Sequence, residues 1–462
     1  MTSSSDPRLA SLEIFIQEHP TIQYATATSP NYSTLRATYT LDNPAIPFAI
    51  VRPQNAEDVA AAVKFAKANG IKPVVRSGGN SLFWKSMVQD SFVIDMRDIA
   101  YVNINKLKTS ATVGGGILFG DLGEHLTNEG LATALGTIPF IGYVGWSTYG
   151  GYGPFSAQYG LGCDNIIGAK VVNWRGEVIE ADSDLLRCIR GAGGAFGPVV
   201  ELTVKLYPLK NILAGLIIYD STDIATTIQN FNSGYQKLSI EGLPPALCAL
   251  QMVLNSPYGK IFACTFIWGS DDHETGQTYL AKIAALGQVV NNTVAPNTIA
   301  GYLQQLKAMV PPNAYGSIET ISIRKLNAEA LAVIARNIEK MPQVDGANFF
   351  MHELRGPSAT PNPESIFGPR EPHMVLELIK TVAEQRDLKR AEDWVGTFID
   401  ELRKMDPRNI LPSTYISITK PGSNSFKNIF GPSNYEVLLE MKRKYDPEGT
   451  FDLAQPEVNS LK

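Results

Sequence analysis

The sequence predicts an α+β fold that binds a nucleotide cofactor, and three observations support this. A glycine-rich turn follows a short β-branched run at Val74–Ser81, and strand-like runs alternate with amphipathic helices on either side of it. Further glycine-rich blocks occur between residues 136 and 200. The chain has 462 residues, more than one hydrophobic core usually holds, so two domains are expected.

The first predicted element beside the turn is a helix over residues 56–69. Asn55 is the expected N-cap, because acidic residues follow it in the first turn, and Gly70 is expected to end the helix. One face of this helix carries the residues that should be buried: Val59, Ala62, Val63 and Ala66.

The turn itself comes next. Gly78 and Gly79 allow the backbone to bend tightly and to present N–H groups to an anion with no Cβ in the way. A pyrophosphate would fit such a turn. An ordinary strand-to-loop turn explains Ser77-Gly78-Gly79 better when the motif stands alone, so the assignment depends on its surroundings.

Two short strands, at residues 92–95 and 111–114, and a helix from near Ile117 to Gly130 are expected after the turn. No Gly-x-Gly-x-x-Gly motif follows a strand here. A Rossmann dinucleotide site is therefore disfavoured.

Four sequence blocks, Arg76–Ser81, Thr137–Asn165, Arg190–Val200 and Asn434–Phe451, carry a family resemblance. With these blocks in this order, the chain resembles the FAD-linked oxidases of the vanillyl-alcohol-oxidase and p-cresol-methylhydroxylase (PCMH) superfamily, in particular the berberine-bridge-enzyme-like branch. Together the blocks span most of the chain, which is more specific than any one of them.

The resemblance implies a PCMH-type FAD-binding domain formed by both chain ends, with a substrate domain of antiparallel sheet backed by helices inserted between them. We expect the first part at residues 1–210, the substrate domain at 211–406 and the last part at 407–462. Within the insertion, strand character occurs at 215–219, 246–254 and 260–268, and helical character at 273–286 and 326–340.

The resemblance also implies which residues contact FAD. They belong to the first turn, to the two central glycine-rich blocks and to the closing segment: Val75, Arg76, Ser77, Gly78, Gly79, Asn80, Ser81, Gly136, Thr137, Ile141, Gly142, Gly145, Ser147, Gly150, Gly151, Gly153, Cys163, Gly197, Val199 and Asn434.

The chain departs from the family at the attachment points of the flavin. Many members hold FAD through two covalent links, a histidine in the first loop and a cysteine in the second block, where this chain has Asn80 and Ile138. Neither side chain can form such a bond, so we expect tight but non-covalent FAD. Asn80 could still hydrogen-bond near the flavin edge. Without the links the flavin should be a weaker oxidant.

The acid–base residues of the family are altered as well. Leu82 stands where an aromatic commonly follows the first loop, and Tyr415-Ile416-Ser417-Ile418 departs from the family's Tyr-x-Asn-Tyr-like segment at the phenol position. The usual base is therefore expected to be missing. Oxidation of a sugar alcohol needs such a base, which argues against a carbohydrate substrate.

Replacement acid–base candidates are His352 and Glu353, in a segment that resembles the family's flavin-facing strand, and Tyr415. Alternation along a strand puts His352 on one face and Glu353 on the other. An ordinary strand histidine, and a surface ion pair of Glu353 with Arg355, would explain the first two without catalysis. Aromatic side chains beside the flavin blocks would suit an apolar substrate, although core packing explains any one of them better: Trp84, Trp146, Tyr149, Tyr152 and Phe155.

Composition limits the remaining possibilities. The net charge of −5 comes without a cluster of Lys and Arg, which argues against nucleic acid as a partner. No apolar stretch approaches the roughly 20 residues of a membrane helix. The start of the sequence has neither a basic nor an apolar signal region, so an intracellular protein is expected. His125 and His373 have no partner at metal-ligand spacing, so no metal is expected.

These observations predict an FAD-dependent oxidoreductase that acts on an apolar small molecule of specialised metabolism, with molecular oxygen reoxidising the flavin. The alternative is a redox-neutral isomerase or cyclase, including a pericyclase, that keeps FAD as a structural or electrostatic cofactor. A catalytically silent flavin-binding protein is a third possibility.

Overall fold

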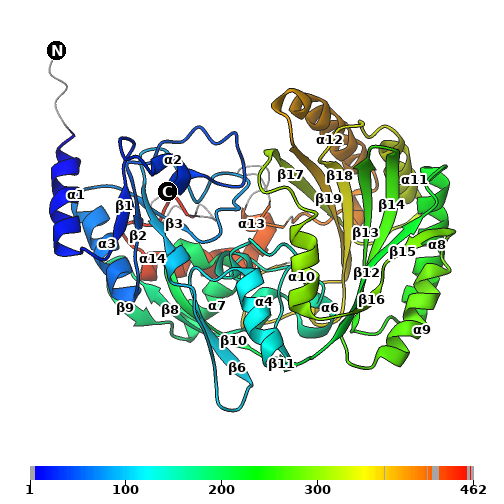
Figure 1. Cartoon of the computed structure of the whole chain (residues 1–462), viewed down its shortest axis with the longest axis horizontal. Helices are drawn as coiled ribbons and strands as arrows, with labels where there is room; N and C mark the ends of the chain where they lie inside the picture. Colours follow the sequence, from blue (N-terminus) through cyan, green and yellow to red (C-terminus); the bar gives the residue numbers. More distant parts are fainter. Residues whose placement is uncertain (1–5, 369, 414, 419–425, 455–457, 459–462) are drawn as a thin grey trace.

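Strands from the first half of the chain build one lobe around two larger sheets and a two-stranded one, β11 (Tyr207–Pro208) with β7 (Leu131–Ala132) (Figure 1). The structure, a computed structural model, describes residues 6–368, 370–413, 415–418, 426–454 and 458. The first sheet has the order β1-β2-β4-β3, with β2 and β3 parallel to β4. Its elements are α1 (Pro7–Glu18), β1 (Gln23–Ala25), β2 (Ala49–Arg52), α3 (Ala56–Ala68), β3 (Pro73–Arg76) and β4 (Phe92–Asp95).

The second sheet of this lobe is antiparallel and has the order β5-β6-β10-β8-β9. It packs with helices from the glycine-rich blocks into one large apolar core. Its elements are β5 (Val102–Ile104), β6 (Ser110–Gly114), α4 (Phe119–Asn128), α5 (Tyr143–Ser147), α6 (Ser156–Tyr159), β8 (Ile166–Val172), β9 (Val178–Glu180), α7 (Ser183–Ala192) and β10 (Val199–Lys205).

An eight-stranded sheet forms the other lobe, in the order β15-β12-β14-β13-β18-β19-β17, with β16 also paired to β12. Its pairs are antiparallel, and helices α8, α9, α11 and α12 bury one face in a second core. The elements are β12 (Ile212–Tyr219), α8 (Ile224–Glu241), β13 (Leu247–Ser256), β14 (Gly259–Trp268), α9 (His273–Ala284), β15 (Val289–Asn292), β16 (Ala295–Asn297), α10 (Ile299–Lys307), β17 (Tyr315–Ile323), α11 (Ala328–Glu339), β18 (Ala347–Leu354), β19 (His373–Val382) and α12 (Leu388–Arg403).

The end of the chain returns to the first lobe, where Figure 1 shows α14 (Pro432–Tyr445) beside elements from the N-terminal half. Lys442 of α14 donates from its Nζ to the Ala195 carbonyl at 2.8 Å. The predicted fold class, α+β with an inserted antiparallel sheet backed by helices, is confirmed. The exact boundaries near residues 210 and 406 stay a prediction.

Local sequence signals located the elements well. The Asn55 side chain caps α3 by accepting from the Asp58 N–H at 2.8 Å, and Gly70 follows the helix with φ +65°. Helices α8 and α12 were not singled out by the sequence.

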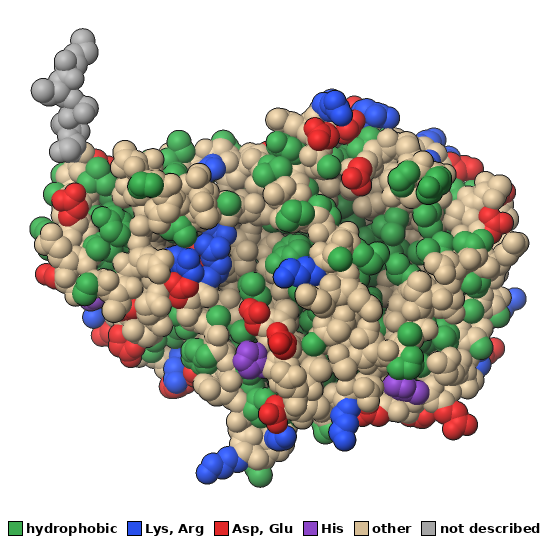
Figure 2. All heavy atoms as spheres, in the orientation of Figure 1, with side chains coloured by type: hydrophobic (Ala, Val, Ile, Leu, Met, Phe, Trp, Pro, Cys, Tyr) green, Lys and Arg blue, Asp and Glu red, His purple; other side chains and the backbone are tan. Residues whose placement is uncertain are grey.

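Among the described residues no helix is both long and apolar enough to cross a bilayer. On the face in Figure 2, charges of both signs are scattered between hydrophobic side chains.

The two edges of the large sheet differ. At the β17 edge, the Ala314 N–H donates to Tyr39 O at 3.0 Å, and the Leu411 N–H donates to Ser322 O at 2.9 Å, so segments of the first lobe and of the returning chain cover both ends of the strand. At the other edge, all four residues of β15 are exposed.

Candidate functional site

The turn after β3 presents main-chain donors that the described protein does not use. The N–H groups of Gly78, Gly79, Asn80 and Ser81 donate to no acceptor in the part of the chain that the structure describes. The Ser77 hydroxyl donates to Gly115 O at 3.1 Å and ties the turn to the glycines after β6. Successive free N–H groups of this kind suit a phosphate oxygen.

The Arg76 side chain does not belong to this anion site, contrary to the expectation from the sequence. Its guanidinium is buried and donates to Leu35 O, and to Ala37 O at 2.6 Å, at the end of α2 (Tyr32–Arg36). Burial lowers the pKa of Arg76 to about 10. The side chain holds neighbouring backbone in place, so only the main chain of Arg76 could meet a cofactor.

Asn80 also differs from its expected role at the flavin edge. Its Nδ2 donates to Gly78 O at 3.1 Å and to Phe140 O at 2.8 Å, which uses both amide hydrogens. The side chain therefore joins the turn to the loop that contains Ile138.

These two loops also touch through their glycines. A Cβ on Gly78 would lie 2.5 Å from the Gly142 nitrogen, and a Cβ on Gly142 would lie 2.3 Å from Ser77 Oγ. Gly145, by contrast, faces space, with nothing within 4 Å of its Cβ position. The indole Nε1 of Trp84, just after the turn, is buried and has no hydrogen-bond acceptor among the residues that the structure describes. Free N–H groups, open space and an unpaired donor together fit a bound flavin nucleotide.

Other predicted FAD contacts shape the protein around this space instead. A Cβ would collide with Phe119 at Gly136, with Phe367 at Gly150, with Gly162 at Gly151, with Leu135 O at Gly153 and with Val172 O at Gly197. These glycines therefore allow close packing of protein against protein in the direction that a Cβ would take.

The remaining predicted contacts vary in their surroundings. Ser147 donates to Val144 O at 3.3 Å within α5, and Asn434 bridges Arg187 Nη2 at 3.2 Å and Ile366 O at 3.1 Å. Cys163 is buried 3.4 Å from Arg370 Nη2, and burial raises the pKa of its thiol to about 12, which keeps it neutral. The others lie in the two loops or the adjoining strands and are half-buried or buried: Val75, Thr137, Ile141 and Val199.

A histidine and a glutamate meet on the sheet face that looks toward the first lobe. In the β18–β19 pairing Phe350 lies opposite Glu377 and His352 opposite Val375, so all four share one face. His352 Nε2 lies 3.2 Å from Glu377 Oε1, close enough for an ion pair but not aligned as a hydrogen bond. Val375 packs in the core of the first lobe, so this face of the sheet is directed toward the first lobe.

Two tyrosines of the first lobe face the same pair. Tyr415 stacks on Tyr152 with ring centroids 4.1 Å apart, and the Tyr152 N–H donates to the Tyr415 hydroxyl at 3.4 Å. Burial raises the pKa of Tyr415 to about 12, and the negative charge of Glu377 acts in the same direction on both phenols. Glu377 thus lies within electrostatic range of the predicted Tyr415 and pairs with the predicted His352.

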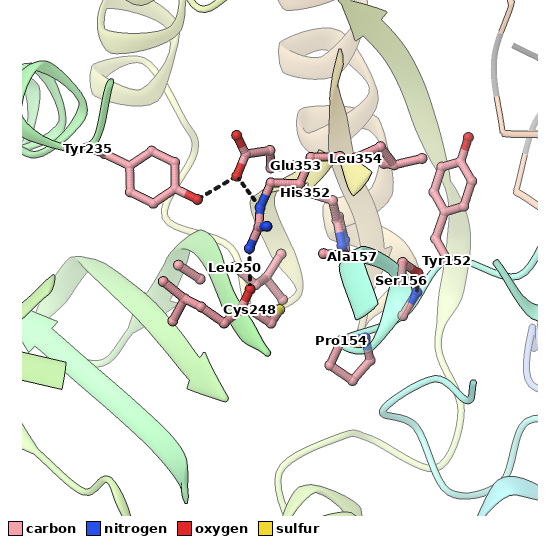
Figure 3. Close-up of a pocket in the computed structure, with 14 residues that line it drawn as sticks. Tyr152, Pro154, Ser156, Ala157, Tyr235, Cys248, Leu250, His352, Glu353 and Leu354 are labelled. Carbon is pink, nitrogen blue, oxygen red and sulfur yellow. Dashed lines mark hydrogen bonds and ion pairs between the residues drawn. The ribbon is translucent and has the colours of Figure 1, made fainter. Parts of the chain in front are cut away.

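Glu353, the third predicted residue, lies elsewhere. Its carboxylate accepts from the Tyr235 hydroxyl of α8 at 2.6 Å and pairs with Arg355 Nε at 3.3 Å (Figure 3). In Figure 3 it turns toward Tyr235, while His352 lies on the side of Ala157. As alternation along the strand predicts, the Glu353 side chain lies on the opposite face of β18 from His352, on the side that helix α8 covers. A pocket of about 30 Å³ lies between these groups.

Glu377 was missed by the sequence reasoning. The signal was present, because Glu377 is a single carboxylate within the apolar run Met374–Ile379, where an acid is costly unless it has a partner or a task. Nearby, His373 donates from Nδ1 to Glu371 O at 2.7 Å, and its buried Nε2 has no hydrogen-bond partner in the described part of the chain. Burial lowers the pKa of His373. The described residues contain no group of three or more His, Cys, Asp or Glu that could hold a metal.

Comparison with known proteins gives the family. Residues 47–182 match the FAD binding domain family. The chain is 32% identical over 445 residues to the FAD-linked oxidoreductase aurO of Gibberella zeae, which covers 95% of this chain and 86% of the relative. It is 27% identical over 451 residues to (R)-6-hydroxynicotine oxidase of Paenarthrobacter nicotinovorans, covering 88% and 90% of the two chains.

A solved structure shows the same fold. The berberine-bridge-enzyme-like protein 1 of Physcomitrella patens superimposes with a TM-score of 0.84 at 21% identity, over 98% of this chain and 99% of the other. At that identity the likeness concerns the fold, whereas the relative from Gibberella zeae carries the family assignment. The chain therefore belongs to the FAD-linked oxidoreductases and has the fold of their berberine-bridge-enzyme-like branch.

Proposed function

We propose that this oxidoreductase binds FAD without a covalent link and oxidises an apolar small molecule of specialised metabolism. Asn80 and Ile138, which stand at the two attachment places, support non-covalent binding. The fungal relative aurO supports the metabolic setting, and (R)-6-hydroxynicotine oxidase is a relative whose name states oxidation of a small molecule.

One observation carries the proposal: Glu377 lies 3.2 Å from His352 on the sheet face toward the first lobe. Bound FAD would supply the hydride acceptor. Glu377 removes a proton from a hydroxyl or amine of the substrate, and His352 takes up that proton or stabilises the carboxylate. The stacked Tyr152 and Tyr415 close the opposite side and exclude water.

The surroundings of Glu377 favour an apolar substrate with one polar group. The same sheet face carries Met252, which lies opposite Phe350, and Leu250 two residues earlier. A flat, mostly apolar molecule would lie between these side chains and the two tyrosines, with its polar group at Glu377.

A second function has support from the same pair. A carboxylate beside an imidazole can move a proton between two carbons of a substrate without net oxidation. The protein would then act as an isomerase or cyclase and keep FAD as a structural or electrostatic cofactor.

Two measurements test these proposals. Acid denaturation should release yellow flavin into the supernatant, and colour that stays in the protein pellet would contradict non-covalent binding. Anaerobic mixing with a panel of apolar phenols, alcohols and amines should bleach the oxidised flavin. Product without bleaching would identify the redox-neutral function, and neither product nor bleaching would contradict both.

A further inference from the structure

We propose that Asn80 is a clamp that fixes the spacing of the two cofactor loops and thereby controls how long FAD stays bound. The first loop is residues 77–81 and the second loop is residues 138–142. This inference rests on the proposed non-covalent binding of FAD.

The clamp consists of one side chain and close backbone packing. Asn80 Nδ2 donates to Phe140 O at 2.8 Å in the second loop and to Gly78 O at 3.1 Å in its own loop. Gly78 and Gly142 pack without room for a Cβ on either side. The Asn80 amide is the only side chain in the first loop that hydrogen-bonds the second loop in the described structure, so it sets their relative position.

The contacts continue beyond the two loops to the other lobe. The Phe140 ring stacks against Tyr39, with centroids 6.1 Å apart. The Tyr39 N–H donates to Gly79 O at 3.0 Å, and Tyr39 O accepts from the Ala314 N–H at 3.0 Å. Asn80 therefore completes a closed set of contacts: Asn80 binds Phe140 of the second loop, Phe140 packs on Tyr39, and Tyr39 binds Gly79 of the first loop. Tyr39 also binds Ala314, which directly precedes β17.

This closed set of contacts matters for FAD because the first loop holds four unused N–H groups. If the loops moved independently, binding would have to order them, and that entropic cost would weaken affinity. In covalent relatives the flavin itself links the two loops. In this chain Asn80 stands at the first attachment place and Ile138 at the second. The Asn80 side chain hydrogen-bonds the main chain of Phe140, two residues after Ile138.

The test compares Asn80→Ala and Asn80→Asp with the unchanged protein. We expect Asn80→Ala to raise the FAD dissociation constant about tenfold and to speed FAD release, since one inter-loop hydrogen bond is lost. Asn80→Asp should weaken binding about 100-fold near neutral pH, because an ionised carboxylate would face two carbonyl oxygens. Flavin fluorescence, which rises when FAD leaves the protein, measures both quantities.

The pH dependence separates a clamp from a general loss of stability. Protonation gives the carboxyl of Asn80→Asp a donor again, so its FAD affinity should recover at least tenfold as the pH falls, whereas Asn80→Ala should show no such recovery. Asn69→Ala is the matched control, because Asn69 Nδ2 also donates to a carbonyl, Phe65 O at 2.9 Å, at the end of α3. It should leave FAD binding unchanged.

The outcomes distinguish the clamp from the function on which it rests. FAD affinity equal to that of the unchanged protein in both Asn80 variants would overturn the clamp, even if their melting temperatures fell. Affinity that falls equally in Asn69→Ala would overturn it too. Failure of the unchanged protein to bind FAD would instead overturn the proposed function.

Discussion

Glu377 is an isolated carboxylate on an apolar strand, and its only close ion-pair partner in the described structure is His352. We expect Glu377→Gln to keep FAD binding and to lower the rate of flavin reduction by substrate about 10²- to 10⁴-fold, because the amide cannot accept the substrate proton. Stopped-flow absorbance under anaerobic conditions measures this rate once a substrate is found.

Glu353→Gln provides the matched control for that experiment. Its carboxylate lies on the α8 side, where Tyr235 and Arg355 hold it. In Glu353→Gln the substrate should reduce the flavin at nearly the rate measured in the unchanged protein. If it loses as much activity as Glu377→Gln, the assignment of the reactive face of β18 is wrong.

His373 introduces a pH dependence of stability. Its pKa is lowered by burial from 6.5, so at mildly acidic pH the unfolded chain binds a proton that the folded chain does not. The stabilisation is therefore complete above pH 6.5 and is lost as the pH falls toward the lowered pKa of the folded state, with a slope of up to about 1.4 kcal/mol per pH unit.

Urea denaturation of the unchanged protein and of His373→Gln at several pH values checks this expectation. The variant should show a shallower decrease below pH 6.5, since glutamine does not titrate. Identical slopes in both proteins would contradict the role of His373.

At the scale of elements, one buried lysine both pairs within the end of helix α14 and joins that helix to the first lobe. Lys442 is 1% exposed, pairs with Asp446 and donates to Ala195 O. Lys442→Met would leave the buried Asp446 carboxylate without its counter-charge, and we expect a loss of about 3 kcal/mol in the free energy of unfolding. Denaturant titration measures it.

Lys444→Met is the control for α14. Lys444 is 48% exposed and pairs at the surface with Asp184 at 3.0 Å. Its removal should cost less than about 1 kcal/mol. Equal losses in the two variants would show that the buried contacts of Lys442 contribute no more to stability than a surface pair does.

Strand β18 shows what local sequence can and cannot predict. Alternation correctly separated His352 from Glu353, because a period of two is a property of any strand. It could not tell which face looks toward the first lobe, since that depends on where helix α8 packs. The pairing of β18 with β19, which brings Glu377 to His352, joins residues 25 positions apart in sequence and has no local signal.

For the whole molecule, the fold was predicted from the family resemblance that the four sequence blocks carry in their order. The same blocks were less reliable for individual contacts. Gly150 and Gly197 have positive φ and face other protein segments, and Arg76 turns into the protein. A glycine indicates that other atoms come close to the backbone at that position, but the sequence does not say whether those atoms belong to the protein or to a ligand.

The unequal edges of the large sheet have a consequence for behaviour in solution. The Ala314 N–H donates to Tyr39 O and the Leu411 N–H donates to Ser322 O, so both ends of β17 are occupied, whereas Val289 and Val290 are exposed on β15. An exposed edge strand offers unpaired backbone N–H and C=O groups, to which a second extended chain can add by hydrogen bonding. Aggregation during concentration or refolding should therefore begin at β15, and a lysine at position 290 would suppress it.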